Sequence, residues 1–241
     1  MGLIDFLYPP KCIGCSEVLS VAEKKARAKG ADALCPNCRA EFERDKLKIC
    51  NRCGREMIDC VCSKSRLHGV GCSELLKLTK YGDDPEQVVK KLIFCQKRNN
   101  DRRCERFLSN QISFLVKRLI SDDASDFCIT HIPREKRNIV LYGYDHAERL
   151  AKSVSEICGV QYVPLLDRKK KGKEQKYLDG EQRAKNVRNV FSISRSAEQY
   201  KDKNIIIIDD VVTTGTSMAE CIRQLRCEGF EKIKGICIAV T

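Results

Sequence analysis

Residues 205–217 read IIIIDDVVTTGTS, and this stretch decides how the chain folds. Four isoleucines in a row are too few for a helix and are β-branched throughout, so residues 204–208 are predicted to form a central strand buried on both faces. Asp209 and Asp210 follow this strand, and a short loop leads into a helix predicted at residues 218–228. A strand, a loop and a helix in this order indicate an α/β fold with a parallel sheet.

The loop between this strand and this helix has the chemistry of a phosphate site. Small residues expose successive backbone N–H groups, hydroxyls add donors, and the helix N-terminus points to the same place. The two carboxylates stand where ligands bind in open α/β sheets, and they can accept hydrogen bonds from a ribose diol. The alternative is that the acids cap a turn and the threonines cap the helix. The candidate residues of this site are Asp209, Asp210, Thr213, Thr214, Gly215, Thr216 and Ser217.

The rest of the C-terminal half alternates helical and strand-like patterns. Helices are predicted at residues 85–94, 106–120 and 145–158, and strands at residues 127–133, 162–166 and 233–240. A polar, lysine-rich loop is expected at residues 167–180. This alternation begins near residue 75, which places the domain boundary between residues 63 and 71. We therefore expect one domain at residues 1–66 and a second at residues 67–241.

The N-terminal part is rich in closely spaced cysteines, which predict two zinc sites. Two CxxC pairs are separated by 19 residues, and a third pair is followed after six residues by a CxC pair. Four thiolates suit tetrahedral zinc, and a closed four-cysteine site is structural. Sequential pairing is the preferred assignment, although the second and third pairs are separated by only 11 residues and could share an ion. An iron–sulfur cluster is a further alternative. The predicted ligands are Cys12, Cys15, Cys35 and Cys38 for one ion and Cys50, Cys53, Cys60 and Cys62 for the other.

The charge balance and the apolar pattern of the sequence limit the ligands and the cellular location that we expect. Lys and Arg exceed Asp and Glu by 12, which suits phosphorylated ligands or nucleic acid, although solvated basic faces would give the same balance. No apolar run approaches the roughly 18 residues of a membrane span, and the N-terminus lacks the pattern of a signal peptide. These features predict a cytoplasmic location, where the remaining cysteines stay reduced.

The stretch at 205–217 resembles the signature of the type I phosphoribosyltransferases, which bind phosphoribosyl pyrophosphate (PRPP) with Mg²⁺. The resemblance implies that Asp209 and Asp210 hold the ribose hydroxyls and act as the catalytic pair, and that residues 213–217 hold the 5′-phosphate. Hypoxanthine-guanine enzymes carry an acid at the position of Thr213, so the resemblance argues against that activity.

The whole chain also resembles the ComF family, which joins a double zinc ribbon to this fold and is linked to DNA uptake in competent bacteria. The opening FLYPPKCIGC at residues 6–15 and the cysteine pairs carry the likeness. A tract within residues 175–191 adds Arg183 and Asn186 as candidate ligand-binding residues. Its matching residues are Gln175, Leu178, Arg183, Asn186 and Phe191.

Two segments depart from the ComF pattern. Residues 142–146, YGYDH, stand where the family has arginine, glycine, an aromatic residue and two amides, and Ile93 stands where it has a lysine. His131 is interpreted as a satisfied loop residue rather than a pyrophosphate ligand. His146 could act as a general base, but the sequence places no partner beside it. Two alternatives therefore stay open beside a PRPP-binding protein of DNA uptake. One is a zinc-dependent module that binds single-stranded DNA or a helicase on an inactive scaffold, and the other is a metabolic phosphoribosyltransferase of unknown acceptor.

Overall fold

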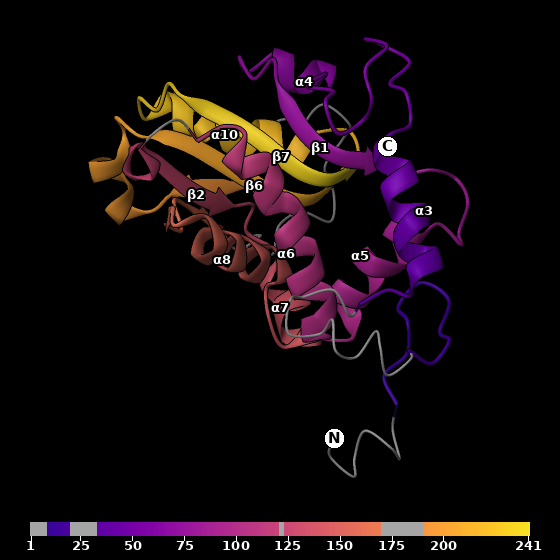
Figure 1. The fold of residues 1–241 in the computed structure, drawn as a ribbon. Coiled ribbons are helices and arrows are strands. Elements are labelled where there is room, and N and C mark those ends of the chain that lie inside the picture. Colours follow the sequence, from indigo (N-terminus) through magenta and orange to yellow (C-terminus); the bar gives the residue numbers. More distant parts are fainter. Residues whose placement is uncertain (1–8, 20–32, 121–122, 170–189) are drawn as a thin grey trace, which may run out of the picture.

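A computed structural model describes residues 9–19, 33–120, 123–169 and 190–241 (Figure 1). Most of the predicted lysine-rich loop and the candidates Arg183 and Asn186 lie outside these residues. Within the described part, no helix combines the length and the apolar character needed to cross a membrane.

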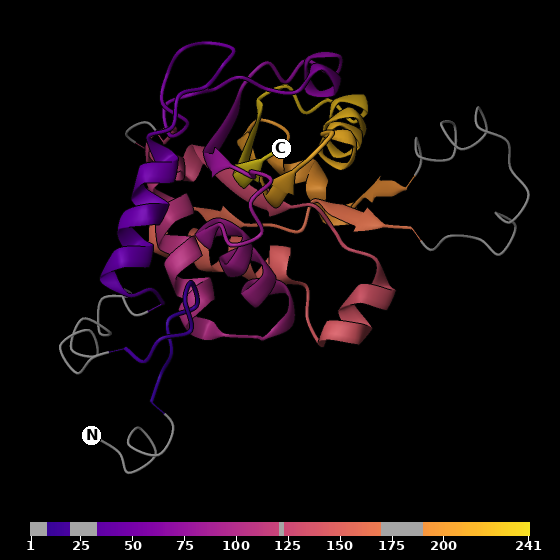
Figure 2. The same cartoon turned by 90° about the vertical axis from the view of Figure 1, so that its right-hand side faces the viewer.

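The core of the molecule is a five-stranded sheet with the order β1-β7-β6-β2-β3, in which every neighbouring pair is parallel. This confirms the predicted α/β fold. A separate antiparallel pair, β4 and β5, projects from one side (Figure 2). The strands are β1 (Leu75–Lys80), β2 (Phe127–His131), β3 (Gln161–Tyr162), β4 (Leu166–Arg168), β5 (Phe191–Ile193), β6 (Asn204–Val212) and β7 (Ile233–Val240).

Helices cover both faces of the sheet because the isoleucines of β6 alternate between the faces. Ile206 and Ile208 pack with α5, α6 and α8 on one face, whereas Ile205 and Ile207 pack with α10 and with Leu67 of α4 on the other. The helices are α3 (Pro36–Lys46), α4 (Ser65–His68), α5 (Val88–Arg98), α6 (Arg102–Lys117), α7 (Lys136–Tyr142), α8 (His146–Cys158) and α10 (Thr216–Cys227), with 3-10 turns η2 (Ala124–Asp126) and η4 (Arg195–Tyr200).

Several predicted boundaries were wrong, and each error has a local cause. β6 extends to Val212 because β7 continues to pair beyond Asp209, with Val211 opposite Ala239. The strand predicted at residues 162–166 is divided between β3 and β4, since Pro164 has no N–H with which to continue a ladder. The sequence pattern did not indicate α7.

The cysteine-rich segment packs directly against the α/β domain. The ring of Phe42 on α3 meets Phe107 on α6 edge to face at 5.2 Å, and both side chains are buried. Further along, Leu75 N donates to Val61 O at 2.9 Å, so the last cysteine pair lies beside the start of β1. The two parts of the chain therefore share one continuous set of buried contacts.

Candidate functional site

The two acids predicted to follow the central strand are part of β6 itself, near its C-terminal end and at the C-terminal edge of the sheet. Asp209 is half-buried and Asp210 is buried, with 3% of its surface exposed. The backbone N–H of Asp210 donates to Asp209 Oδ1 at 2.9 Å, and that of Val211 donates to Asp210 Oδ1 at 2.7 Å. The adjacent carboxylates are thereby held in different surroundings.

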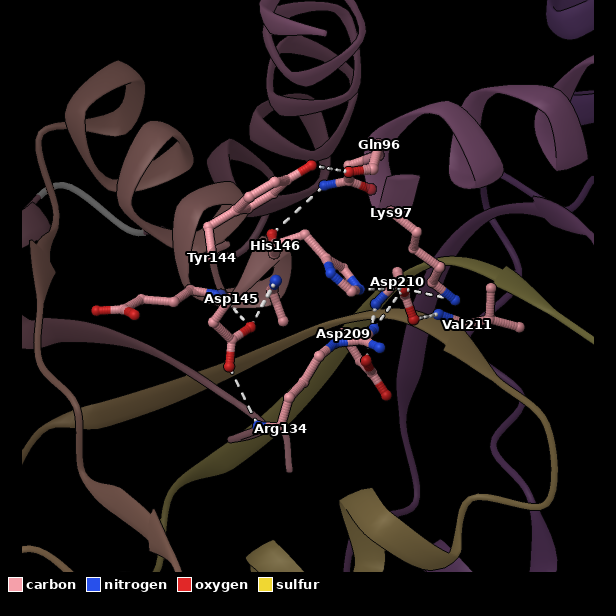
Figure 3. Close-up of polar contacts among 11 residues, drawn as sticks. Gln96, Lys97, Arg134, Tyr144, Asp145, His146, Asp209, Asp210 and Val211 are labelled. Atoms are coloured by element: carbon pink, nitrogen blue, oxygen red, sulfur yellow. Dashed lines mark hydrogen bonds and ion pairs between the residues drawn. The ribbon is translucent and has the colours of Figure 1, made fainter. Parts of the chain in front are cut away.

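Three nitrogen-bearing side chains converge on one oxygen of Asp210, as Figure 3 shows. Asp210 Oδ2 lies 2.6 Å from Arg134 NH2, 2.8 Å from Lys97 Nζ and 3.3 Å from His146 Nε2. Arg134 follows β2, Lys97 is on α5, and His146 is the first residue of α8. Both oxygens of Asp210 are therefore engaged by the protein itself.

These surroundings separate the pKa values of the two acids. Burial and the negative charge of Asp210 raise the pKa of Asp209 to about 7. Burial alone would raise the pKa of Asp210, but the close contact with the His146 ring and the charges of Arg134 and Lys97 outweigh it and hold that pKa far below its usual range. Asp210 is thus a permanent anion, whereas Asp209 titrates near neutrality.

The hydroxyl-rich loop after β6 turns through Gly215, whose φ of +75° is left-handed and suits glycine. Gly215 is buried, and a Cβ placed on it would lie 3.3 Å from Lys64 Cβ and 3.4 Å from Leu67 Cγ. The segment that leaves the cysteine-rich region therefore packs against this loop. Helix α10 begins at Thr216, so its N-terminal N–H groups face the same end of the sheet as the acids.

A cavity of about 510 Å³ lies between the two acids and the loop. Arg168 reaches it from β4, donates to Glu135 Oε1 at 3.0 Å and approaches Pro133 O at 3.4 Å. Cations, acids and hydroxyls thus meet around one space of the size of a small ligand. The lining residues are Tyr81, Lys97, Ile132, Pro133, Arg134, Glu135, Arg168, Asp209, Asp210, Val211, Thr213 and Ser217.

Asp145 fixes the backbone beside this cavity. Its Oδ1 accepts hydrogen bonds from the N–H groups of Ala147 and Glu148 and caps α8, while its Oδ2 accepts from Arg134 N at 3.1 Å. His131 is buried, and its Nδ1 lies 3.0 Å from Tyr162 OH. The interpretation of His131 as a satisfied structural residue agrees with this contact.

The eight paired cysteines form two groups, each with its four sulfur atoms within 4.8 Å of one another. The groups are Cys12, Cys15, Cys35 and Cys38, and Cys50, Cys53, Cys60 and Cys62, which confirms sequential pairing. A tetrahedral zinc ion with Zn–S bonds of about 2.3 Å needs sulfurs roughly 3.8 Å apart. Cys15 and Cys35 sulfurs lie 3.7 Å apart, and those of Cys53 and Cys60 lie 3.6 Å apart, so both groups fit the ion.

Comparison with known proteins finds two family models in this chain. Residues 3–74 match the family model of the double zinc ribbon domain, and residues 143–240 match that of the phosphoribosyl transferase domain. Competence protein F of Haemophilus influenzae is 23% identical, over 93% of this chain and 94% of its own length. The DNA utilization protein YhgH of Escherichia coli O157:H7 is 22% identical, over 100% of this chain and 97% of its own.

The chain belongs to the ComF family. A ribose-phosphate pyrophosphokinase of Methanopyrus kandleri is similar over a shorter stretch, 29% identical over 104 residues, which are 43% of this chain and 30% of that enzyme. The zinc-ribbon match and the two cysteine groups support structural zinc sites in the N-terminal part. The second match identifies the α/β part as a phosphoribosyltransferase domain.

In this ComF protein, the structure brings some predicted site residues together and adds others. Asp209, Asp210, Thr213 and Ser217 surround the cavity. Thr214, Gly215 and Thr216 build the loop beside it, and the hydroxyls of Thr214 and Thr216 lie 2.9 Å apart. The reading of His146 as a residue with no partner was wrong, because the end of β6 brings Asp210 to it.

Sequence reasoning missed Lys97, Arg134 and Arg168. Ile93 replaces the family lysine, yet Lys97 lies one helical turn further on and reaches the acids from the same helix. A lysine four residues after Ile93, on the same face of a predicted helix, is a sequence signal that could have indicated Lys97. Arg168 left no comparable signal in the sequence, since only the folding of β4 against the loop after β2 places it at the cavity.

Proposed function

We propose that this ComF protein binds PRPP with Mg²⁺ in the cavity at the end of β6, and that it uses this ligand in DNA uptake or processing. One observation carries the proposal: carboxylates, a hydroxyl-rich loop at a helix N-terminus and three cations line the same space. A sugar bearing phosphates at both ends needs these three kinds of group. The names of the full-length relatives, Competence protein F and DNA utilization protein, support the DNA role.

The structure suggests a different part for each acid. Asp210 is already engaged by three side chains, so we assign it to holding Lys97 and Arg134 in place. Asp209 is half-buried and lines the cavity, which leaves it to accept hydrogen bonds from the ribose hydroxyls. The N–H groups at the start of α10 and the hydroxyls of Thr213 and Ser217 would bind the 5′-phosphate.

Two cations of the cavity are suited to binding a pyrophosphate group. Lys97 and Arg134 line the same cavity as the phosphate loop and could donate charge-assisted hydrogen bonds to a pyrophosphate. Bound Mg²⁺ would supply further positive charge to a departing pyrophosphate. If transfer occurs, this chain's own residues bind and orient the sugar at both ends and leave its anomeric carbon facing an acceptor.

Thermal unfolding with and without PRPP and Mg²⁺ tests this function. At a ligand concentration of 100 times Kd, binding adds about 2.7 kcal/mol to the free energy of unfolding, so the melting temperature should rise. Asp209→Asn should abolish this rise. Asp202→Asn is the matched control, because Asp202 is exposed in the turn before β6 and does not line the cavity.

An unchanged melting temperature of the parent protein at millimolar PRPP would contradict ribose-phosphate binding. An equal rise in the parent and in Asp209→Asn would instead contradict the part assigned to Asp209.

A groove next to the cavity favours a second function, the binding of single-stranded nucleic acid. The groove measures about 600 Å³ and shares Tyr81 with the ribose-phosphate cavity. Phe94 in its wall is 53% exposed, and Lys90, Lys91 and Arg103 accompany it. Exposed aromatic rings beside cations are the usual platform for unpaired bases.

Fluorescence anisotropy with a labelled oligonucleotide at several salt concentrations tests this second function. Phe94→Ala should weaken binding about 5- to 100-fold, since stacking contributes about 1–3 kcal/mol per base. Phe114→Ala is the matched control, because Phe114 is also exposed and also lies under an arginine four residues on. Affinity that does not fall with salt, or equal losses in both variants, would contradict the groove as the binding site.

A further inference from the structure

Lys77 is unusual among the cations of this protein because it is buried. It lies on β1 with 1% of its surface exposed, and among the described residues it is the only lysine or arginine buried to this degree. Removing an ammonium group from water costs several kcal/mol unless an anion and hydrogen-bond acceptors replace the water. The position of Lys77 therefore calls for a compensating negative charge.

The immediate neighbours of Lys77 belong to the second cysteine group. Its Nζ donates to Cys62 O at 2.6 Å and to Leu75 O at 3.1 Å. Within the described part of the chain, Lys77 forms no ion pair with a carboxylate. The two carbonyls accept two of its hydrogens, and one of these carbonyls belongs to Cys62, a predicted zinc ligand.

A zinc centre formed by the second cysteine group would provide the negative charge that a buried ammonium group needs. Four thiolates and one Zn²⁺ carry a net charge of −2, and an ammonium group beside them would halve it. We propose that Lys77 is the counter-ion of the second zinc centre, and that it ties this metal to the edge strand of the phosphoribosyltransferase sheet.

The backbone around the second centre supports this connection. Cys62 forms a β-bridge with Glu74, and Leu75 N donates to Val61 O at 2.9 Å, so the ligand segment runs alongside the start of β1. Val240, at the end of β7, packs against Cys50, Met57 and Cys60. The second zinc centre thus extends the edge of the sheet.

The first cysteine group is built differently. Its Cys12 sulfur accepts from Cys35 N at 3.2 Å, and Gly14 lies close to Cys38 and Val88. No lysine or arginine is buried beside it within the described residues. If Lys77 compensates the second centre, the two zinc ions should respond differently to the loss of this one side chain.

Zinc release from the native full chain to a colorimetric chelator tests the proposal. Lys77→Gln should weaken the second site about 10- to 100-fold and leave the first unchanged, because outer-shell partners of metal ligands have effects of this size. Mass spectrometry of maleimide-labelled cysteines shows which group has released its metal. Lys80→Gln is the matched control, since Lys80 is on the same strand but exposed.

A zinc-release curve of Lys77→Gln that matches the parent, or loss of metal from Cys12, Cys15, Cys35 and Cys38 instead, would overturn the proposal. A measurement on the parent protein tests it even if Lys77→Gln does not fold. When the chelator removes zinc from that protein, maleimide should label the cysteines of the first group before those of the second. The reverse order would contradict the role of Lys77.

Discussion

The zinc ribbon and the cavity at the end of β6 are assembled from the sequence in different ways. Each cysteine group draws its four ligands from two consecutive close pairs of the chain, and tight turns hold the two cysteines of each pair together. The cavity instead collects Lys97 from α5, Arg134 from the loop after β2, Arg168 from β4 and Asp210 from β6. The ribbon therefore depends on its metal, whereas the cavity depends on the order of strands in the sheet. The predictions that follow test this difference.

Loss of a zinc ligand should have the largest effect. Cys12→Ser removes one of four thiolates, and zinc coordination contributes about 10–16 kcal/mol to the folding of small zinc modules. We expect bound zinc to fall from two ions to one, with proteolytic cleavage confined to the first half of the ribbon. Metal analysis and limited proteolysis measure these effects. Cys227→Ser, which changes an exposed cysteine outside both groups, should retain both ions.

Within the cavity, the two adjacent acids should differ in their effect on stability. Asp210→Asn leaves Arg134 and Lys97 without their buried anion and should lower the free energy of unfolding by about 3–5 kcal/mol. Asp209→Asn should raise the free energy of unfolding of the ligand-free protein at pH 8, because the folded state disfavours the ionised carboxyl that this variant lacks. Urea unfolding of both variants measures the difference. Equal losses would show that the two acids share one role.

The smallest effect should appear in the pH dependence of stability. The pKa of Asp209 is raised to about 7 in the folded protein, against about 3.9 in an unfolded chain. Between these values the folded state binds more protons, so the contribution of Asp209 to stability should fall as pH rises from 4 to 7. Melting curves of the parent protein and Asp209→Asn between pH 5 and 8 measure this contribution. Parallel profiles would contradict a raised pKa.

The sequence predicted the features that depend on local spacing. The isoleucine run of β6, the glycine turn and both cysteine groups are confirmed because neighbouring residues alone determine them. Asp145 illustrates the limit of such reasoning. The helix predicted at residues 145–158 is confirmed as α8, which Asp145 caps and which Gly159 ends in a left-handed conformation. Asp145 also accepts a hydrogen bond from the backbone N–H of Arg134. This contact depends on how β2 and α8 pack together, which local spacing does not determine.

The cluster around Asp210 could not be predicted for the same reason. His146 and Lys97 are far from β6 in sequence, and only the parallel register that sets His131 opposite Ile208 brings β2, α8 and the acids to one edge of the sheet. A family comparison by position alone recorded Ile93 as a lost lysine, although one helical turn restores the cation. Arg183 and Asn186 lie outside the described residues, and their part in ligand binding stays a prediction.

A crystal structure of the protein grown with Mg²⁺ and PRPP tests the central claim most directly. We predict a 5′-phosphate bound by the N–H groups at the start of α10, ribose hydroxyls at Asp209, and a pyrophosphate near Lys97 and Arg134. Density for the ligand at another site, or an empty cavity in a crystal saturated with PRPP, would contradict the account.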